Sequence, residues 1–211
     1  MLYGALKLIT APTVEPVVVA DVKEWLRVES GVTADDNLCA SLLKAVRRNV
    51  EHHTKRNLCS ATWDWVLDDA LPSEPFNLPL PPVQSVTGIY FTDDDDVEGS
   101  AVSTSKYLVD VNDKMRPARV ILKSGSTWGD TDRRSVMGTR IRIVAGYGSA
   151  GTTTAASGAT AGDVPEDIVL AIKRMILTNY ENREDVLVDA SVASIPKDAR
   201  MLLAPYRVLR V

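Results

Sequence analysis

The spacing of apolar residues changes at Ala61, and this change constrains the fold more than any other feature of the sequence. Before it, the stretch from Asp35 to Arg56 repeats apolar residues at the intervals of a helix face. After it, Thr62 to Asp68 alternates apolar and polar residues with the period of two that is typical of a half-buried strand. The pattern predicts a helical part and a sheet part.

Helical spacing recurs in four segments, which are 20–28, 35–56, 163–183 and 196–203. In the first, Val22, Trp25 and Leu26 share one face, so Trp25 is expected to be a buried packing residue. In the second, Asp35 and Asp36 suit a helix start by capping and by the helix dipole.

The middle of the chain is predicted to be a β-module. Strands are expected at 62–68, 83–91, 107–111, 118–122 and 140–145, and residues 71–82 hold five prolines and have to be extended or turning. Short connections favour antiparallel pairing. The proline-containing segment 5–18 is expected to be an extended arm in which 5–9 form an edge strand.

These elements predict an α+β fold, in which N- and C-terminal helices form a small bundle with an inserted antiparallel β-module. The expected division is an arm and bundle helices at 1–60, the β-module at 61–147, a flexible loop at 148–162, and the remaining helices with an extended tail at 163–211. The loop is expected to be mobile because residues 149–162 are only Gly, Ala, Ser and Thr.

The composition narrows the class of protein. A net charge of −4 over 211 residues argues against a dedicated DNA binder, which would carry a basic excess. Cys39 and Cys59 are too few for a disulfide framework and are expected to be reduced, with Cys39 in the core. The first residues do not form a signal peptide, and no apolar run reaches the roughly 18 residues of a membrane span. We expect a soluble protein that is made in a cytoplasm.

Signals for catalysis, cofactors and metals are weak. His52 and His53 are adjacent on a helix and diverge by about 100°, so a zinc site that joins one of them to Cys59 would be short of ligands. The run Asp93–Asp96 lacks the ligand spacing of a calcium loop and is better explained as a solvated hairpin tip. No phosphate-binding loop or nucleophile elbow is present. The four tryptophans are expected to pack rather than to stack on bases.

The C-terminal stretch carries an excess of cations. Two interpretations stay open, a solvated tail and an interaction arm that adds a strand to the sheet edge of a partner. The residues expected to make this interaction are Lys197, Arg200, Tyr206, Arg207, Val208, Leu209, Arg210 and Val211.

Motifs along nearly the whole chain resemble those of one family. In order they are APTVEPV at 11–17, DVKEWLRV at 21–28, the acidic pair 35–36, VEHHTKR at 50–56, LPLPPVQSV at 78–86, YLVD at 107–110, PARV at 117–120, AGYG at 145–148, VPEDI at 164–168, NYENRE at 179–184 and LLAPYR at 202–207. Together they resemble the head–tail connector proteins (adaptor or head-completion proteins) of long-tailed bacteriophages, in particular the longer members with a β-insertion.

The resemblance implies a structural virion protein that is not an enzyme. Such an adaptor forms a ring, commonly of twelve copies, under the portal protein, extends the DNA channel, and joins the capsid to the tail or to the next neck protein. It implies that the C-terminal segment engages the portal, that DNA passes without specific binding, and that no cofactor or membrane is involved. The location would be the virion neck, and the host cytoplasm during assembly.

Two alternatives stay open at this point. One is another component of the same neck, such as a stopper or tail-completion protein. The other is a small-molecule-binding or enzymatic domain, for which a concave site with perturbed titratable groups would be expected.

Overall fold

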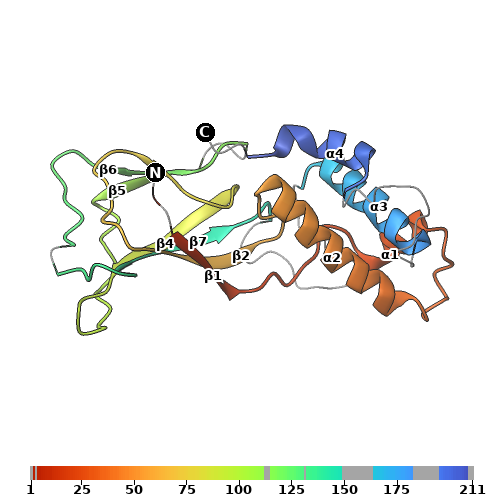
Figure 1. The fold of residues 1–211 in the computed structure, drawn as a ribbon, viewed down its shortest axis with the longest axis horizontal. Helices are drawn as coiled ribbons and strands as arrows, with labels where there is room; N and C mark the ends of the chain where they lie inside the picture. Colours follow the sequence, from red (N-terminus) through yellow and green to blue (C-terminus); the bar gives the residue numbers. More distant parts are fainter. Residues whose placement is uncertain are drawn as a thin grey trace. The chain divides into compact units, whose positions relative to one another are not determined.

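The computed structural model describes residue 2 and residues 4–111, 115–130, 132–148, 164–182 and 195–208. The chain divides into two compact units, which we call the β unit (Met1–Pro12 with Ser60–Ala150) and the helical unit (Thr13–Cys59 with Gly151–Val211). Four α-helices and antiparallel sheets among the described residues confirm the predicted α+β class (Figure 1). The predicted loop 149–162 lies outside the described residues.

The β unit holds two sheets, and every strand pair in them is antiparallel, as predicted. The larger sheet has the order β1 (Gly4–Thr10), β2 (Ala61–Leu67), β7 (Thr139–Ala145) and β4 (Val83–Phe91). The smaller sheet has the order β3 (Phe76–Asn77), β6 (Arg119–Leu122) and β5 (Tyr107–Asp110). The proline-rich segment supplies β3 and the cis bond between Pro81 and Pro82.

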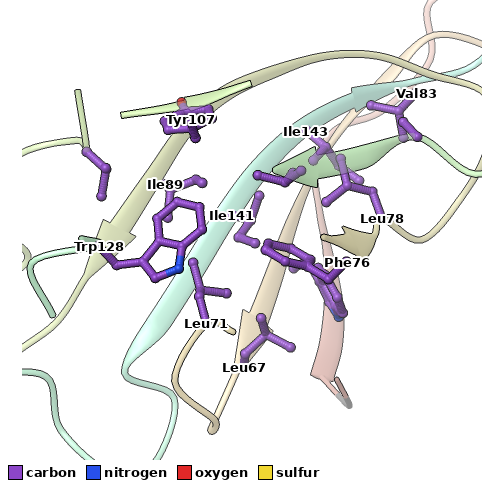
Figure 2. Close-up of a cluster of buried hydrophobic side chains, with 14 residues drawn as sticks. Leu67, Leu71, Phe76, Leu78, Val83, Ile89, Tyr107, Trp128, Ile141 and Ile143 are labelled. Carbon is purple, nitrogen blue, oxygen red and sulfur yellow. The ribbon is translucent and has the colours of Figure 1, made fainter. Parts of the chain in front are cut away.

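The core of the β unit follows from the alternation along its strands. On β7, Ile141 and Ile143 are fully buried, whereas Arg140 and Arg142 point to the opposite face. Figure 2 shows Ile141 between Phe76 on one side and Ile89 and Trp128 on the other, and the rings of Phe76 and Trp128 meet edge to face. Trp65 and Trp128 are each 5% exposed, which agrees with a packing role for both.

The first residues of the chain belong to the β unit. β1 pairs with β2 from Gly4 opposite Leu67 to Leu8 opposite Trp63, at the edge of the larger sheet. The expected edge strand is therefore confirmed, but the assignment of residues 1–12 to an arm of the helical bundle is wrong. The physical reason is that backbone groups in this segment find partners on β2, a pairing that spans the whole of α1 and α2 in the sequence.

The helical unit contains α1 (Val19–Trp25), α2 (Asp36–Thr54), α3 (Glu166–Glu181) and α4 (Lys197–Leu203). A 3-10 turn, Ala204–Tyr206, follows α4. α3 packs against α2 and α4, and the buried face predicted for it is observed, with Ile168, Ile172 and Ile176 fully buried. On α2 the predicted face is only partly right: Val46 and Val50 are buried, but Leu38 and Leu42 are half-buried and Ala45 is exposed, while Cys39 and Leu43 are buried instead. Cys39 and Cys59 are also buried, with free thiols.

Trp25 is 39% exposed, so its predicted burial is wrong. α1 ends at Trp25, which leaves Leu26 at the C-cap, and the loop that follows folds back over Lys23. The Lys23 ammonium is buried and donates to the carbonyls of Ser30 (3.2 Å) and Val32 (2.7 Å). The side chain that is buried next to Val22 is therefore Lys23, whereas Trp25, for which the apolar pattern predicted burial, is exposed.

The acidic start of α2 serves tertiary contacts rather than a cap. The side chain of Asp35, the N-cap residue, makes no capping hydrogen bond and accepts one from the Tyr180 hydroxyl at 2.8 Å. Asp36 lies 2.8 Å from the Lys23 ammonium. The capping role predicted for this pair is therefore wrong, because the two carboxylates tie α2 to α3 and to α1.

Candidate functional site

The C-terminal segment of the helical unit presents one mixed apolar and cationic surface. α4 buries Ala199 and Leu203 against the unit, which leaves Lys197, Arg200 and Met201 exposed on its outer side. Met201 is 71% exposed. The sequence analysis missed Met201, although its position two residues before buried Leu203 on a short helix was a usable signal.

The end of this segment is anchored on α2. The backbone N–H of Val208 donates to the carbonyl of Thr54 at 2.9 Å, and Arg56 donates through Nε to the carbonyl of Tyr206 at 2.5 Å. The Tyr206 hydroxyl donates to Asp167 at the start of α3, at 3.1 Å. Tyr206 and Val208 are half-buried, so this part of the expected extended tail is not a fully solvated one.

Exposed cations lie near His53 at the end of α2, and we call Lys55, Arg200 and Arg207 the cationic patch. The pKa of His53 lies below its ordinary value, first because the ring is partly buried, then because Arg207 and Arg200 lie nearby. His52 and Lys55 act in the same direction. Residues far apart in the sequence therefore create one positive surface.

Five of the eight predicted contact residues can be placed. Lys197, Arg200 and Arg207 are exposed, while Tyr206 and Val208 serve mainly to hold the segment against α2 and α3. Leu209, Arg210 and Val211 lie outside the described residues. The structure thus adds Lys55 to the cations near the C-terminal segment and Met201 to the exposed side of α4.

A buried ion cluster, made by Glu15, Arg47 and Glu51, connects α2 to neighbouring segments of the helical unit. Arg47 lies 2.6 Å from Glu15 and 2.7 Å from Glu51, and Glu51 also accepts the backbone N–H of Leu58 at 2.9 Å. Burial raises the pKa of Glu51, against the opposing effect of Arg47. Burial alone would lower the pKa of Arg47, but Glu51 and Glu15 raise it. The cluster joins the segment before α1, α2 and the chain after α2.

The β unit carries a second charged cluster, on the face of the larger sheet away from the core. Asp64 on β2 accepts from Arg142 at 2.7 Å and from Arg140 at 2.9 Å, both on the neighbouring β7. The Arg140 guanidinium also stacks on Tyr90, 4.4 Å from the ring centroid. These contacts explain why a carboxylate that is 3% exposed can stay charged.

The aspartate run forms a turn, as the hairpin-tip interpretation expected. Asp93 accepts the backbone N–H groups of Asp95 and Val97, and Asp96 pairs with Arg134. Within the described residues, no three His, Cys, Asp or Glu side chains are placed to hold a metal ion. No helix in that part of the chain is long and apolar enough to cross a membrane.

Comparisons with known proteins support a role in a phage-like particle. No family model matches the chain, and no curated protein matches its sequence. Among solved structures, a chain in the neck of an empty GTA particle, computed with C6 symmetry, has a TM-score of 0.72 at 25% identity, covering 98% of this chain and 97% of that one.

Two further structures share the fold. A chain in the virion of a native gene transfer agent (GTA) particle has a TM-score of 0.74 at 23% identity, with 98% of this chain and 96% of that chain covered. A chain in the neck of a native GTA particle, computed with C12 symmetry, has a TM-score of 0.68 at 22% identity, with 98% and 97% covered. The matches support a structural component of the neck of a phage-like virion, which is the broader part of the resemblance seen in the sequence.

Proposed function

We propose that this protein is a head–tail adaptor of a phage-like particle. In this proposal it forms a ring under the portal, extends the DNA channel, and joins the capsid to the tail or to the next neck protein. The observation that carries the proposal is the full-length match to a chain of a GTA particle neck, which includes both the helical and the β unit. Catalysis has no part in this role.

The proposed portal contact is the outer side of α4 together with the cationic patch. Lys197, Arg200, Met201 and Arg207 are exposed there, and Leu209, Arg210 and Val211 continue the same segment. Anchoring by Tyr206 and Val208 fixes the exposed side chains in place before a partner arrives, which lowers the entropy lost on binding. A partner with an acidic rim around an apolar pocket would fit this surface.

Passage of DNA fits the overall charge. At a net charge of −4, the protein has no excess of cations with which to hold the phosphate backbone along its length. A conduit benefits from this, because a genome that is bound tightly cannot leave. The particle neck is the proposed site of action, with assembly in the host cytoplasm.

Two experiments test the adaptor role. Deletion of the gene is expected to give DNA-filled heads without tails, and normal tailed particles would contradict the proposal. With purified portal protein, Arg200→Glu/Arg207→Glu is expected to weaken binding at least about tenfold. The matched control is Lys44→Glu/Arg48→Glu, which reverses two exposed cations in the middle of α2. Equal loss in both variants would mean that the patch has no specific role. Binding to a tail-side protein instead of the portal would favour a stopper.

A further inference from the structure

Besides β4, the end strands of the two sheets are β1, β3 and β5, and because β3 has only two residues, β1 and β5 offer the longer free edges among the described strands. β1 lies at one end of the larger sheet and pairs only with β2, and β5 lies at one end of the smaller sheet and pairs only with β6 (Figure 1). We call the outer sides of β1 and β5 the open edges. They belong to different sheets, so each molecule carries two distinct ones.

β4, the end strand on the other side of the larger sheet, is partly covered by the chain that follows it. There the chain after β4 returns along it, and Gly99 donates to the carbonyl of Phe91 at 2.9 Å while Val102 donates to that of Ile89 at 2.8 Å. These bonds occupy acceptors that an incoming strand would need. Because β4 is partly covered in this way, the uncovered edge of β1 at the other end of the sheet is the candidate pairing site.

The open edges carry the exposed apolar side chains of the strands. Every residue of β1 is exposed, with Leu6 at 39% and Leu8 at 43%. On β5, Leu108 is 54% exposed. Among the described residues, the large apolar side chains that are exposed on strands are these three and Ile9, also on β1.

β1 has few of the usual defences of an edge strand along residues 4–8. Soluble proteins blunt such edges with prolines, bulges or charges. Between Gly4 and Leu8, β1 has no proline, an unshifted register with β2, and one charge, on Lys7; its register shifts only between Leu8 and Thr10. Beside it, the indole N–H of Trp63, the residue paired with Leu8, is buried without an acceptor among the described residues. This edge has the features of one that a further strand completes.

We propose that the open edge of β1 in one copy pairs with the open edge of β5 in the next copy, so that strand pairing links the β units of neighbouring copies. The inference rests on the proposed ring. Contact between two different surfaces of the same chain is head-to-tail, and such contacts propagate until they close into a ring. The backbone supplies the hydrogen bonds, and burial of Leu6, Leu8 and Leu108 supplies the apolar contribution.

Edge-blocking variants of the full chain test this pairing. Leu6→Lys/Leu8→Lys blocks β1 and leaves β5 intact, and Leu108→Lys does the reverse. Because these side chains are exposed, both variants are expected to unfold at nearly the temperature of the original protein. Val136→Lys, which alters a 60% exposed residue outside the strands, is the control.

In sedimentation, the original protein and the control are expected to form concentration-dependent oligomers. Each blocked variant alone is expected to be monomeric, with association weakened at least about tenfold. An equimolar mixture of the two is expected to stop at heterodimers, since one copy keeps β5 and the other keeps β1. Dimers of the Leu108→Lys variant alone would indicate β1–β1 pairing and overturn the proposal, as would the absence of oligomers in the original protein.

Cysteine cross-linking separates this inference from the adaptor role. In the double variant Leu6→Cys/Leu108→Cys, oxidation on portal-bound protein is expected to give ladders of covalent oligomers, because Cys39 and Cys59 are buried. Portal binding without ladders would overturn the strand pairing and leave the adaptor role standing. Ladders in protein that does not bind the portal would overturn the adaptor role alone. Loss of tail attachment with intact rings in the β1 variant would mean that β1 serves another protein.

Discussion

Val208 donates its backbone N–H to the carbonyl of Thr54, over 2.9 Å, and so ties the last described residue of the chain to the last residue of α2. Thr54 is fully buried. The surface proposed to meet the portal is therefore built on the core of the helical unit. Changes near the chain end are expected to alter stability as well as binding, and the two effects have to be measured separately.

Removal of residues 206–211 is expected to lower the free energy of unfolding by about 2 kcal/mol or more. The truncation deletes the carbonyl to which Arg56 donates and the N–H that binds Thr54. Tyr206→Phe removes the exposed hydrogen bond to Asp167 and is expected to cost less than about 1 kcal/mol. Urea unfolding compares the two, and equal stability of the truncated and full chains would contradict the anchoring.

Lys23→Ala is expected to destabilise the protein by about 1–3 kcal/mol. The substitution leaves the carbonyls of Ser30 and Val32 without their donor and removes the ion pair with Asp36. Lys44→Ala, at an exposed position on α2, is the control and should change the free energy by less than about 0.5 kcal/mol. Similar effects in the two variants would show that the buried ammonium contributes nothing specific.

Asp64→Asn is expected to reduce stability near neutral pH, with a smaller deficit in acid. Burial favours the protonated form of Asp64, but hydrogen bonds from Arg142 and Arg140 outweigh it and hold its pKa below the ordinary value. The unfolded chain thus takes up the proton first as the pH falls. The stabilisation is present above the unfolded pKa of about 4 and is lost as the pH drops through the folded value.

Chemical denaturation of the Asp64→Asn variant at pH 7 and at several values below pH 4 measures this convergence. Asp94→Asn, at an exposed turn position, is a suitable control. A deficit that stays constant down to the lowest pH would mean that the charge of Asp64 is not responsible.

Trp25→Ala is expected to cost less than about 1 kcal/mol, because the side chain is 39% exposed. A buried tryptophan at this position would have cost roughly 3–5 kcal/mol. Ile172→Ala, at a fully buried position on α3, is expected to cost about 2–5 kcal/mol. Thermal unfolding of both variants checks the contrast, and a large loss for Trp25→Ala would contradict its exposure.

Arg207→Ala is expected to raise the pKa of His53. Burial and then Arg207 lead the causes that lower this pKa, so removal of the guanidinium relieves part of the effect. Because protonation is harder in the folded chain, His53 should also cost stability as the pH falls below about 6.5. NMR titration of the imidazole follows the first effect, and an unchanged pKa would place Arg207 away from the patch.

Elements with strong local patterns were predictable from the sequence. β4 and β7 were placed almost to the residue, and on β7 the alternation along the strand directly reflects one buried face. The buried face of α3 was placed correctly for the same reason, with a period of 3.6. In these segments the local preference of each residue agrees with the final fold.

Features that depend on distant partners were not predictable. The pairing of β1 with β2, and hence its place in the β unit, needs a strand that begins at Ala61. Burial of Lys23 depends on how the next loop folds back, and the Arg47 cluster depends on Glu15. At the candidate site, the sequence shows the charges near the chain end, but only the fold brings Arg200 and Arg207 close to Lys55 and His53.

The two units alternate along the chain, and this order has a consequence for synthesis. A ribosome delivers α1 and α2 first, then nearly all of the β unit, and only then α3 and α4. The apolar face of α2 stays partly uncovered meanwhile, since α3, which packs against it, is made after the β unit. A nascent chain therefore completes its β unit before its helical unit. The proposed portal surface forms with the final residues, so an unfinished molecule cannot occupy a place in the neck.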